Sequence, residues 1–176
     1  MKKLALAGWI LCYAQLVFAQ YKPVDQGSSI KFKVKNFGFN SGGSFSGLQG
    51  TIDFDPEKPG ESKFDVTIQA ASVNTDNESR DNHLREESYF DVKNYPLIRF
   101  VSTRISGKGG NFTFTGNLTI KKKTKEISFP FTISMEKDGY LFKGEFNINR
   151  KEFGVGGSST ISDNVDVMLS VHAQKG

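Results

Sequence analysis

The sequence predicts an all-β fold: an eight-stranded antiparallel barrel with a short helix in the crossover between the third and fourth strands. Three observations support it. Apolar and polar residues alternate along about eight segments, turn-forming Gly, Pro and Asp residues separate them, and the alternation stops over one charged stretch, residues 75–92. Strands with one apolar face pack as a sandwich or close into a barrel, and closure is favoured because it removes exposed strand edges.

The expected strands follow one another without an internal repeat or a linker. Asp138-Gly139 predicts a tight type I′ hairpin, since these residues accept the positive φ that this turn requires. Pro56 and Pro59 end the second strand, because proline cannot donate to a β-ladder. The strands are expected to contain residues 30–34, 45–54, 64–70, 97–104, 112–120, 127–135, 140–148 and 165–171.

The N-terminal segment predicts a secretory signal peptide, residues 1–19. Lys2 and Lys3 precede an apolar run, and the Val-Phe-Ala sequence that ends at Ala19 is typical of a signal-peptidase site. The apolar run is too short to span a bilayer comfortably. A lipoprotein signal that uses Cys12 and a retained anchor are the alternatives. We expect cleavage after Ala19 and a periplasmic or secreted protein.

Cleavage leaves one domain, residues 20–176, long enough for a real core. Cys12 is the only cysteine, so the exported domain has no disulfide framework. The formal net charge of +4 falls by two when Lys2 and Lys3 are removed, a bias too weak to indicate nucleic acid or an anionic membrane. The basic run at residues 121–125 predicts a solvated hairpin turn, with a head-group contact as the alternative.

An eight-stranded barrel has an interior that side chains fill or that holds one small ligand. Many Phe residues have inward parity, as do Gly116 and Gly144. Large rings beside missing side chains favour a cavity, and a simply well-packed core is the alternative. The candidate ligand-binding residues of the lumen are Phe32, Val34, Phe64, Val66, Phe100, Phe112, Phe114, Phe129, Phe131 and Phe146.

The charged stretch predicts a helix over residues 76–88 that covers one mouth of the barrel. Thr75 and Glu78 have the spacing of a capping box, and Asp81 and Arg85 are an i,i+4 pair in the favoured order. The candidate lid or head-group residues are Arg80, His83, Leu84 and Tyr89.

Catalytic chemistry has little support in this sequence. The second histidine, His172, is on the last expected strand, far from His83, and the exported domain has no cysteine to complete a metal site. No Gly-rich phosphate loop and no nucleophile elbow is present. A spatial Ser-His pair or a pair of carboxylates stays open, without local support. We expect no enzyme, no metal and no cofactor, with His83 a hydrogen-bonded lid residue and a ligand contact as the alternative.

Six short motifs spread over the exported domain form a recognisable set. They are RDNHL at 80–84, YFDV at 89–92, YPLIRF at 95–100, GNLTI at 116–120, NRKEFG at 149–154 and DNV at 163–165. The set closely resembles the signature of the YceI-like family, the polyisoprenoid-binding group of bacterial periplasmic proteins. The resemblance covers nearly the whole exported domain. It departs at Tyr89, where the family usually has Phe.

The resemblance implies a lipocalin-like barrel that binds a long-chain amphiphile, such as an isoprenoid, an isoprenoid quinone or a fatty-acid derivative, with no established enzymatic activity. We therefore expect an exported protein that sequesters or carries such a lipid in its lumen. The alternatives are a stress or interaction protein with a filled barrel and, less favoured, an enzyme acting on an isoprenoid lipid. The expected partner is a hydrophobic small molecule, without nucleic acid or stable membrane insertion, and a homodimer is left open.

Overall fold

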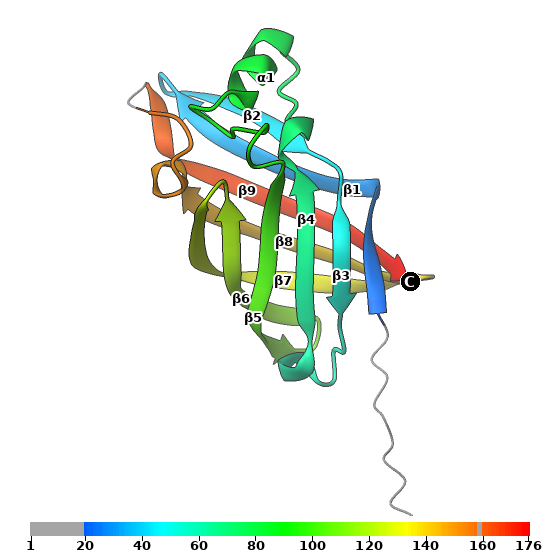
Figure 1. The fold of residues 1–176 in the computed structure, drawn as a ribbon. Coiled ribbons are helices and arrows are strands. Elements are labelled where there is room, and N and C mark those ends of the chain that lie inside the picture. Colours follow the sequence, from blue (N-terminus) through cyan, green and yellow to red (C-terminus); the bar gives the residue numbers. More distant parts are fainter. Residues whose placement is uncertain (1–19, 158–159) are drawn as a thin grey trace, which may run out of the picture.

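The chain forms a closed antiparallel barrel with one short helix, which confirms the predicted fold class (Figure 1). The computed structural model describes residues 20–157 and 160–176, so the predicted signal peptide lies outside the described residues. The sheet has the order β2-β1-β3-β4-β5-β6-β7-β8-β9, and β1 also pairs with β9, which closes it. The strands are β1 Gln20–Asn36, β2 Phe39–Phe45, β3 Gln49–Asp53, β4 Lys63–Gln69, β5 Leu97–Lys108, β6 Asn111–Ile120, β7 Lys123–Glu136, β8 Gly139–Asn149 and β9 Ile161–Lys175.

The strands β2 and β3 are two halves of one position in the eight-stranded barrel. β1 pairs with β2 through residues 30–36 and with β3 through its first two residues, so the two halves lie end to end along one partner. The chain leaves the ladder between them, where the N–H groups of Gly47 and Leu48 donate to the Asp25 carboxylate at 3.0 Å. The second strand is therefore longer than the predicted residues 45–54 and is interrupted.

The connection between β1 and β2, rather than the one between β7 and β8, has the positive φ angles of a type I′ turn. Phe37 has φ 50° and Gly38 has φ 82°. The β7–β8 hairpin is tight as predicted, but neither Asp138 nor Gly139 has a positive φ, so the turn type was wrong. Gly139 is required for a different reason, because a Cβ there would overlap the carbonyl oxygen of Ala173 on β9.

The crossover from β4 to β5 contains α1, Glu78–Arg85, which is shorter than the predicted helix of residues 76–88. Asn77 is the N-cap, and its side-chain oxygen accepts the backbone N–H of Arg80 at 2.9 Å. An Asn at this position satisfies one of the N–H groups that the first helical turn leaves unpaired.

The predicted capping box and the predicted ion pair of α1 were both wrong. The hydroxyl and the N–H of Thr75 both donate to the buried Asp81 carboxylate, at 2.6 and 2.8 Å, so Thr75 does not cap the helix with Glu78. Asp81 therefore does not pair with Arg85, whose guanidinium donates to the carbonyl of Ala71 at 2.8 Å. Thr75 and Asp81 thus bond each other, and Arg85 bonds a carbonyl that lies outside the helix.

The two ends of the barrel differ. The end that we call the mouth carries the two longest connections, from β4 to β5 and from β8 to β9, and the first of them contains α1, which Figure 1 draws at the top. The opposite end, called the closed end, carries shorter turns and a short 3₁₀ helix, η1 Pro59–Glu61. The connections at the mouth are residues 37–38, 70–96 with η2 Ala70–Ser72, 121–122, and 150–160 with η3 Arg150–Phe153.

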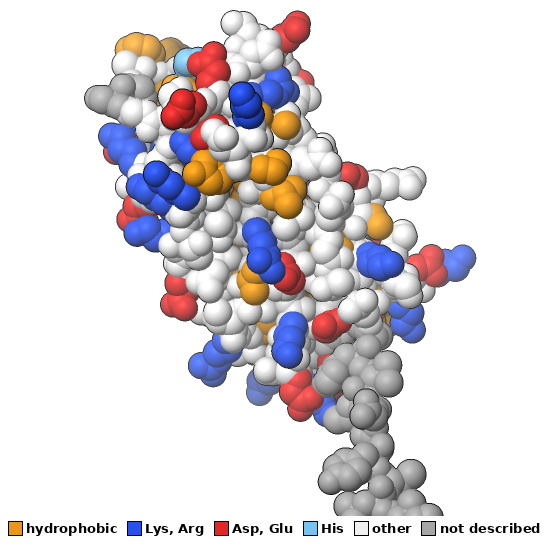
Figure 2. All heavy atoms as spheres, viewed as in Figure 1, with side chains coloured by type: hydrophobic (Ala, Val, Ile, Leu, Met, Phe, Trp, Pro, Cys, Tyr) orange, Lys and Arg blue, Asp and Glu red, His pale blue; other side chains and the backbone are white. Residues whose placement is uncertain are grey.

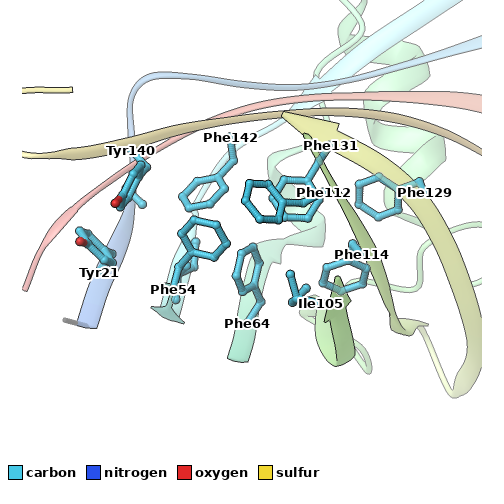
Figure 3. Packing of buried hydrophobic residues seen from close by; sticks show 12 residues of the cluster. Tyr21, Phe54, Phe64, Ile105, Phe112, Phe114, Phe129, Phe131, Tyr140 and Phe142 are labelled. Atoms are coloured by element: carbon cyan, nitrogen blue, oxygen red, sulfur yellow. The ribbon is translucent and has the colours of Figure 1, made fainter. Parts of the chain in front are cut away.

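Aromatic rings fill the closed end (Figure 3). Phe54, which is 2% exposed, lies edge-on to Phe112 at 5.3 Å, to Phe142 at 5.4 Å and to Phe64 at 5.9 Å between ring centroids. Edge-to-face contacts of this kind are favourable beyond the area that they bury. The closed end is therefore a packed core.

A second apolar cluster holds the connections of the mouth against the strands. Phe153 of η3 is buried with Val155, and both pack with Ile98, Leu118 and Ile120 of β5 and β6. Among the described residues, no helix has the length and apolar character needed to cross a bilayer.

Candidate ligand-binding cavity

A cavity of about 280 Å³ occupies the mouth half of the barrel interior. This volume lies near the lower limit of roughly 300 Å³ that is usual for small-molecule sites. Most of its lining residues are aliphatic or aromatic, and every strand of the barrel contributes to the lining. A narrow apolar space of this kind suits a slender hydrocarbon chain better than a bulky polar molecule.

Most of the lumen residues predicted from the sequence border this cavity. Phe112 does not: it is 3% exposed and lies in the packed closed end, stacked on Phe131 with centroids 5.5 Å apart. The predicted lumen residues on the cavity wall are Phe32, Val34, Phe64, Val66, Phe100, Phe114, Phe129, Phe131 and Phe146.

The inner face of β9 is a large part of the wall that the predicted site left out. Val165, Val167, Leu169 and Val171 all border the cavity and are only half-buried. Their partial exposure has a direct cause, since they face enclosed space instead of other side chains. Their alternation was visible in the sequence, and the same parity argument that selected the Phe residues would have included them.

Three rings form the floor of the cavity. Phe64 lies 5.9 Å from Phe131 and 5.4 Å from Phe142 between ring centroids, and Phe131 lies 6.2 Å from Phe142. All three border the cavity on one side and contact Phe54 on the other. The cavity is therefore closed at this depth and opens towards the mouth.

A row of stacked rings runs along one wall above this floor. Phe129 stacks on Phe114 at 5.2 Å and on Phe146 at 4.7 Å. The Phe129 ring can adopt this position because residue 144 is a glycine: a Cβ there would lie 2.8 Å from Cε2 of the ring. Pairing large rings with a glycine at inward parity thus positions the rings flat against the wall.

Polar side chains border the cavity at the mouth. Thr75 and Arg80 are both part of its lining. The Arg80 guanidinium donates from Nε to the Thr75 hydroxyl at 2.7 Å and from Nη2 to the Thr75 carbonyl at 2.6 Å. Because Thr75 is also bonded to Asp81, this network fixes a cationic group at the entrance of an apolar space.

The lid residues predicted from the sequence separate into two groups. Arg80, Leu84 and Tyr89 border the cavity. His83 does not: its Nδ1 lies 3.1 Å from an oxygen of Glu86, and its ring packs on Tyr89 with centroids 4.7 Å apart, on the exposed side of the helix. Nothing in this arrangement directs His83 towards the interior.

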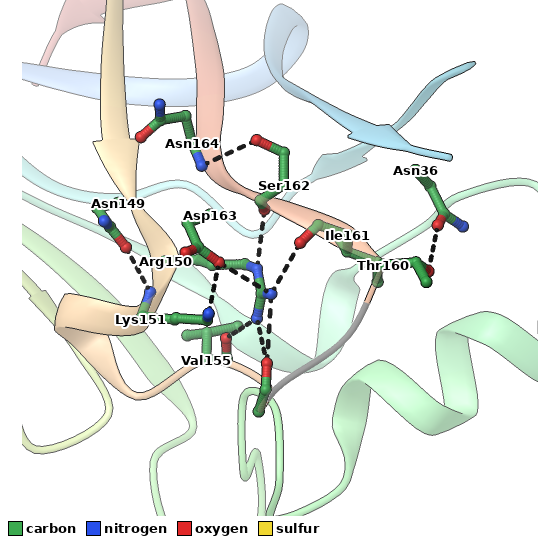
Figure 4. A network of polar contacts seen from close by, with 11 residues as sticks. Asn36, Asn149, Arg150, Lys151, Val155, Thr160, Ile161, Ser162, Asp163 and Asn164 are labelled. Carbon is green, nitrogen blue, oxygen red and sulfur yellow. Dashed lines mark hydrogen bonds and ion pairs between the residues drawn. The ribbon is translucent and has the colours of Figure 1, made fainter. Parts of the chain in front are cut away.

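Arg150 anchors the segment that forms the other side of the mouth (Figure 4). Its buried guanidinium donates to the carbonyl oxygens of Val155 at 2.8 Å, and of Ser162 and Ile161 at 3.0 Å. It also lies 3.3 Å from the Asp163 carboxylate. The rigid fork of an arginine suits several carbonyls at once, so this side chain holds the loop together.

The described part of the chain offers no group of three or more His, Cys, Asp or Glu residues that could hold a metal ion. What the arrangement provides chemically is apolar contact along the walls and hydrogen-bond donors at the entrance.

The comparisons with known proteins agree with this geometry. The family model of the YceI-like domain matches residues 21–173, which confirms the resemblance in the sequence motifs. The chain is similar to a UPF0312 protein of Pseudomonas savastanoi pv. phaseolicola, with 33% identity over 177 residues that cover 95% of this chain and 92% of that one. It is also similar to a UPF0312 protein of Pseudomonas aeruginosa, with 32% identity over 178 residues that cover 96% and 93%.

Solved structures show the same fold. The crystal structure of Burkholderia cenocepacia BcnA has a TM-score of 0.78 at 27% identity and covers 83% of this chain and 96% of that one. A polyisoprenoid binding domain from Saccharophagus degradans has a TM-score of 0.71 and covers 91% and 100%. Its identity of 14% supports the likeness of the fold alone.

Proposed function

The chain belongs to the YceI-like family, and on that premise we propose that it binds a long-chain amphiphile in its barrel cavity as an exported carrier or sequestering protein. The candidate ligands are an isoprenoid, an isoprenoid quinone or a fatty-acid derivative. Export follows from the signal peptide expected at residues 1–19 and places the protein in the periplasm or outside the cell.

The half-buried inner face of β9 carries this proposal. Val165, Val167, Leu169 and Val171 leave apolar surface uncovered inside the barrel, although apolar surface is normally removed from water on folding. A hydrocarbon chain in the cavity would cover that surface. Each methylene moved out of water contributes about 0.8 kcal/mol, so even part of a long tail would bind favourably.

The polarity of the cavity supports one orientation of the ligand. The tail would point towards the floor at Phe64, Phe131 and Phe142, where no polar partner is available to a head group. The head would lie at the mouth, where the Arg80 guanidinium has N–H groups beyond the two that it donates to Thr75. A carbonyl, hydroxyl or anionic group suits such donors.

Binding, rather than catalysis, is the function that this geometry favours. An enzyme acting on the tail would need a nucleophile or a general base inside the lumen. The wall and floor residues named above are apolar, and the polar groups of the network at Thr75 satisfy one another.

Two neighbouring residues on β9 give a matched test. Leu169 faces the cavity, whereas Met168 faces outwards and pairs with Lys31 across the sheet. A carboxylate at residue 169 would be desolvated beside the tail, so Leu169→Asp should carry at most about a tenth of the parent's lipid. Met168→Asp should carry nearly as much lipid as the parent, because the new charge lies on the outer face of the sheet, opposite Lys31.

The measurement is lipid extracted per mole of folded protein, after native purification and after incubation with an isoprenoid quinone or a fatty acid. Circular dichroism identifies the variants that are folded. A folded Leu169→Asp variant with the parent's full lipid content would place the ligand elsewhere. If the parent takes up none of these lipids, the carrier proposal fails. The alternative, a barrel that binds another partner, would then be favoured.

A further inference from the structure

Two phenylalanine side chains project into solvent at the mouth. Phe37 and Phe39 flank Gly38 in the β1–β2 turn and are 75% and 80% exposed. Figure 2 shows hydrophobic side chains at the upper left, the corner where Figure 1 draws this turn. Single exposed apolar residues are common on protein surfaces, but two rings together on a projecting turn indicate a contact surface.

The turn leads directly into the cavity. Phe39 pairs with Asn36 across the hairpin, so their side chains lie on one face of it, the face that also carries Val34. Asn36 and Val34 border the cavity. The Thr160 hydroxyl donates to the Asn36 side chain at 2.9 Å and ties the turn to the segment that follows η3. The face of the hairpin that carries Phe39 therefore continues to the wall of the ligand site.

The hairpin that carries the rings is basic. Lys31, Lys33 and Lys35 are exposed on its outer face, and residues 29–45 contain no Asp or Glu. Across the sheet, Lys33 pairs with Asp166 of β9. Exposed carboxylates of the mouth lie instead on α1 and its flanks, at Asp76, Glu78, Glu86 and Glu87, and on η3 at Glu152. Aromatic rings next to lysines are the residues that settle at the boundary between water and an anionic lipid surface.

We propose that the tip of the β1–β2 hairpin docks on the surface of an anionic phospholipid bilayer, with Phe37 and Phe39 at head-group depth. The mouth of the cavity would then face the lipid. An amphiphile that moves from the bilayer into a facing cavity never exposes its hydrocarbon chain to water. This inference goes beyond ligand binding, because it concerns a separate surface. The role of this surface in lipid transfer rests on the proposed function.

Vesicle flotation of the purified protein tests the docking surface. The probes are vesicles of phosphatidylethanolamine and phosphatidylglycerol, compared with vesicles of phosphatidylcholine alone. The test variant combines Phe37→Asn with Phe39→Ser. Asn tolerates the positive φ of residue 37, and Asn-Gly is a preferred type I′ pair, so the hairpin should keep its shape. The control is Met135→Ser, since Met135 is 78% exposed near the closed end.

The parent should float with the anionic vesicles and bind phosphatidylcholine vesicles several-fold less. The double variant should lose roughly tenfold or more in partitioning, because both inserted rings are removed. Met135→Ser should stay within about twofold of the parent. Uptake of an isoprenoid quinone dispersed in detergent should be equal in parent and double variant, which separates docking from ligand binding.

Three results would overturn the docking proposal. They are a parent that does not float, a double variant that floats like the parent, and a Met135→Ser variant that loses binding equally. If the parent does not float but forms a dimer that depends on Phe37 and Phe39, the tip contacts a second copy of the chain instead. Failure of quinone uptake by the parent, with flotation intact, would count against the proposed function alone.

Discussion

Thr75 donates both its hydroxyl and its backbone N–H to one oxygen of the buried Asp81 carboxylate, at 2.6 and 2.8 Å. The same hydroxyl accepts the Nε–H of Arg80 at 2.7 Å. The first turns of α1 are therefore fastened to the chain that precedes the helix, and Arg80 is held at the entrance of the cavity.

Loss of this carboxylate should loosen the lid. Asp81→Ala leaves two buried donors of Thr75 without their acceptor, so we expect the free energy of unfolding to fall by about 1–3 kcal/mol. Urea titration followed by circular dichroism measures it. The exposed neighbour Ser79 is the control, and Ser79→Ala should change stability by less than about 0.5 kcal/mol. An Asp81→Ala variant as stable as the parent would show that the network does not hold the helix.

Two phenylalanines that both point into the barrel should differ in how much stability is lost when each is replaced by alanine. Phe112→Ala should lower the free energy of unfolding by about 3–5 kcal/mol, because its ring is packed on every side in the closed end. Phe146→Ala should lower it by less, since that ring is half-buried and faces the cavity. Thermal unfolding of the two variants, with bound lipid removed, makes the comparison. Equal losses would contradict the division into a packed end and a hollow end.

Lysine should not be able to replace Arg150, although it has the same charge. Arg150→Lys keeps the charge but cannot reach several carbonyls at once, so we expect a loss of about 2–4 kcal/mol in the free energy of unfolding. Arg104→Lys, at an exposed position on β5, should be nearly neutral. Similar small effects at both sites, in chemical denaturation, would mean that the loop does not depend on the guanidinium.

One surface ion pair should give a small dependence of stability on pH. The Arg99 guanidinium donates to Asp65 at 2.8 Å and holds the pKa of that carboxyl below its usual value. A lowered folded-state pKa means that the contribution is present above the unfolded value, about 3.9, and is lost as pH falls through the folded value. Both side chains are about half exposed to solvent, so the contribution of this ion pair to stability should be small.

Comparing the parent with Asp65→Asn by urea titration at several pH values tests this sign. The stability difference between them should be largest near neutral pH and should disappear in acid. The exposed turn residue Asp138 is the control, because Asp138→Asn should give no comparable trend. A difference that grows as pH falls would contradict the assigned pKa shift.

The walls of the cavity could be predicted from sequence because parity fixes which face of a strand points inwards. The position of each ring along the barrel axis, in the packed end or beside the cavity, could not be predicted in the same way. Phe112 and Phe114 share one parity on β6, yet Phe112 lies in the packed end and Phe114 borders the cavity. Which rings meet and exclude space depends on rings that other strands supply, such as Phe54 after β3. Alternation along a single strand does not contain that information.

The lid was less predictable because its local signals compete with tertiary partners. Thr75 has the spacing of a capping residue, but the Asp81 carboxylate takes its hydroxyl and Asn77 caps the helix instead. The exposed tip was missed for a related reason. Phe39 has the inward parity of β2, whose Ser41 and Phe45 border the cavity, yet it lies past the rim of the barrel, and alternation alone does not show where the rim lies.

Photo-crosslinking with two isoprenoid analogues tests the central claim most directly. One carries a diazirine at the far end of its tail, and the other carries it next to the head group. Peptide mapping should find the tail-end label at the floor, on the peptides that contain Phe64, Phe131 or Phe142, and the head-end label near Arg80, Leu84 or Tyr89. Tail-end labels at the mouth, or labels on the outer faces of the strands, would contradict a ligand held tail-first in the barrel.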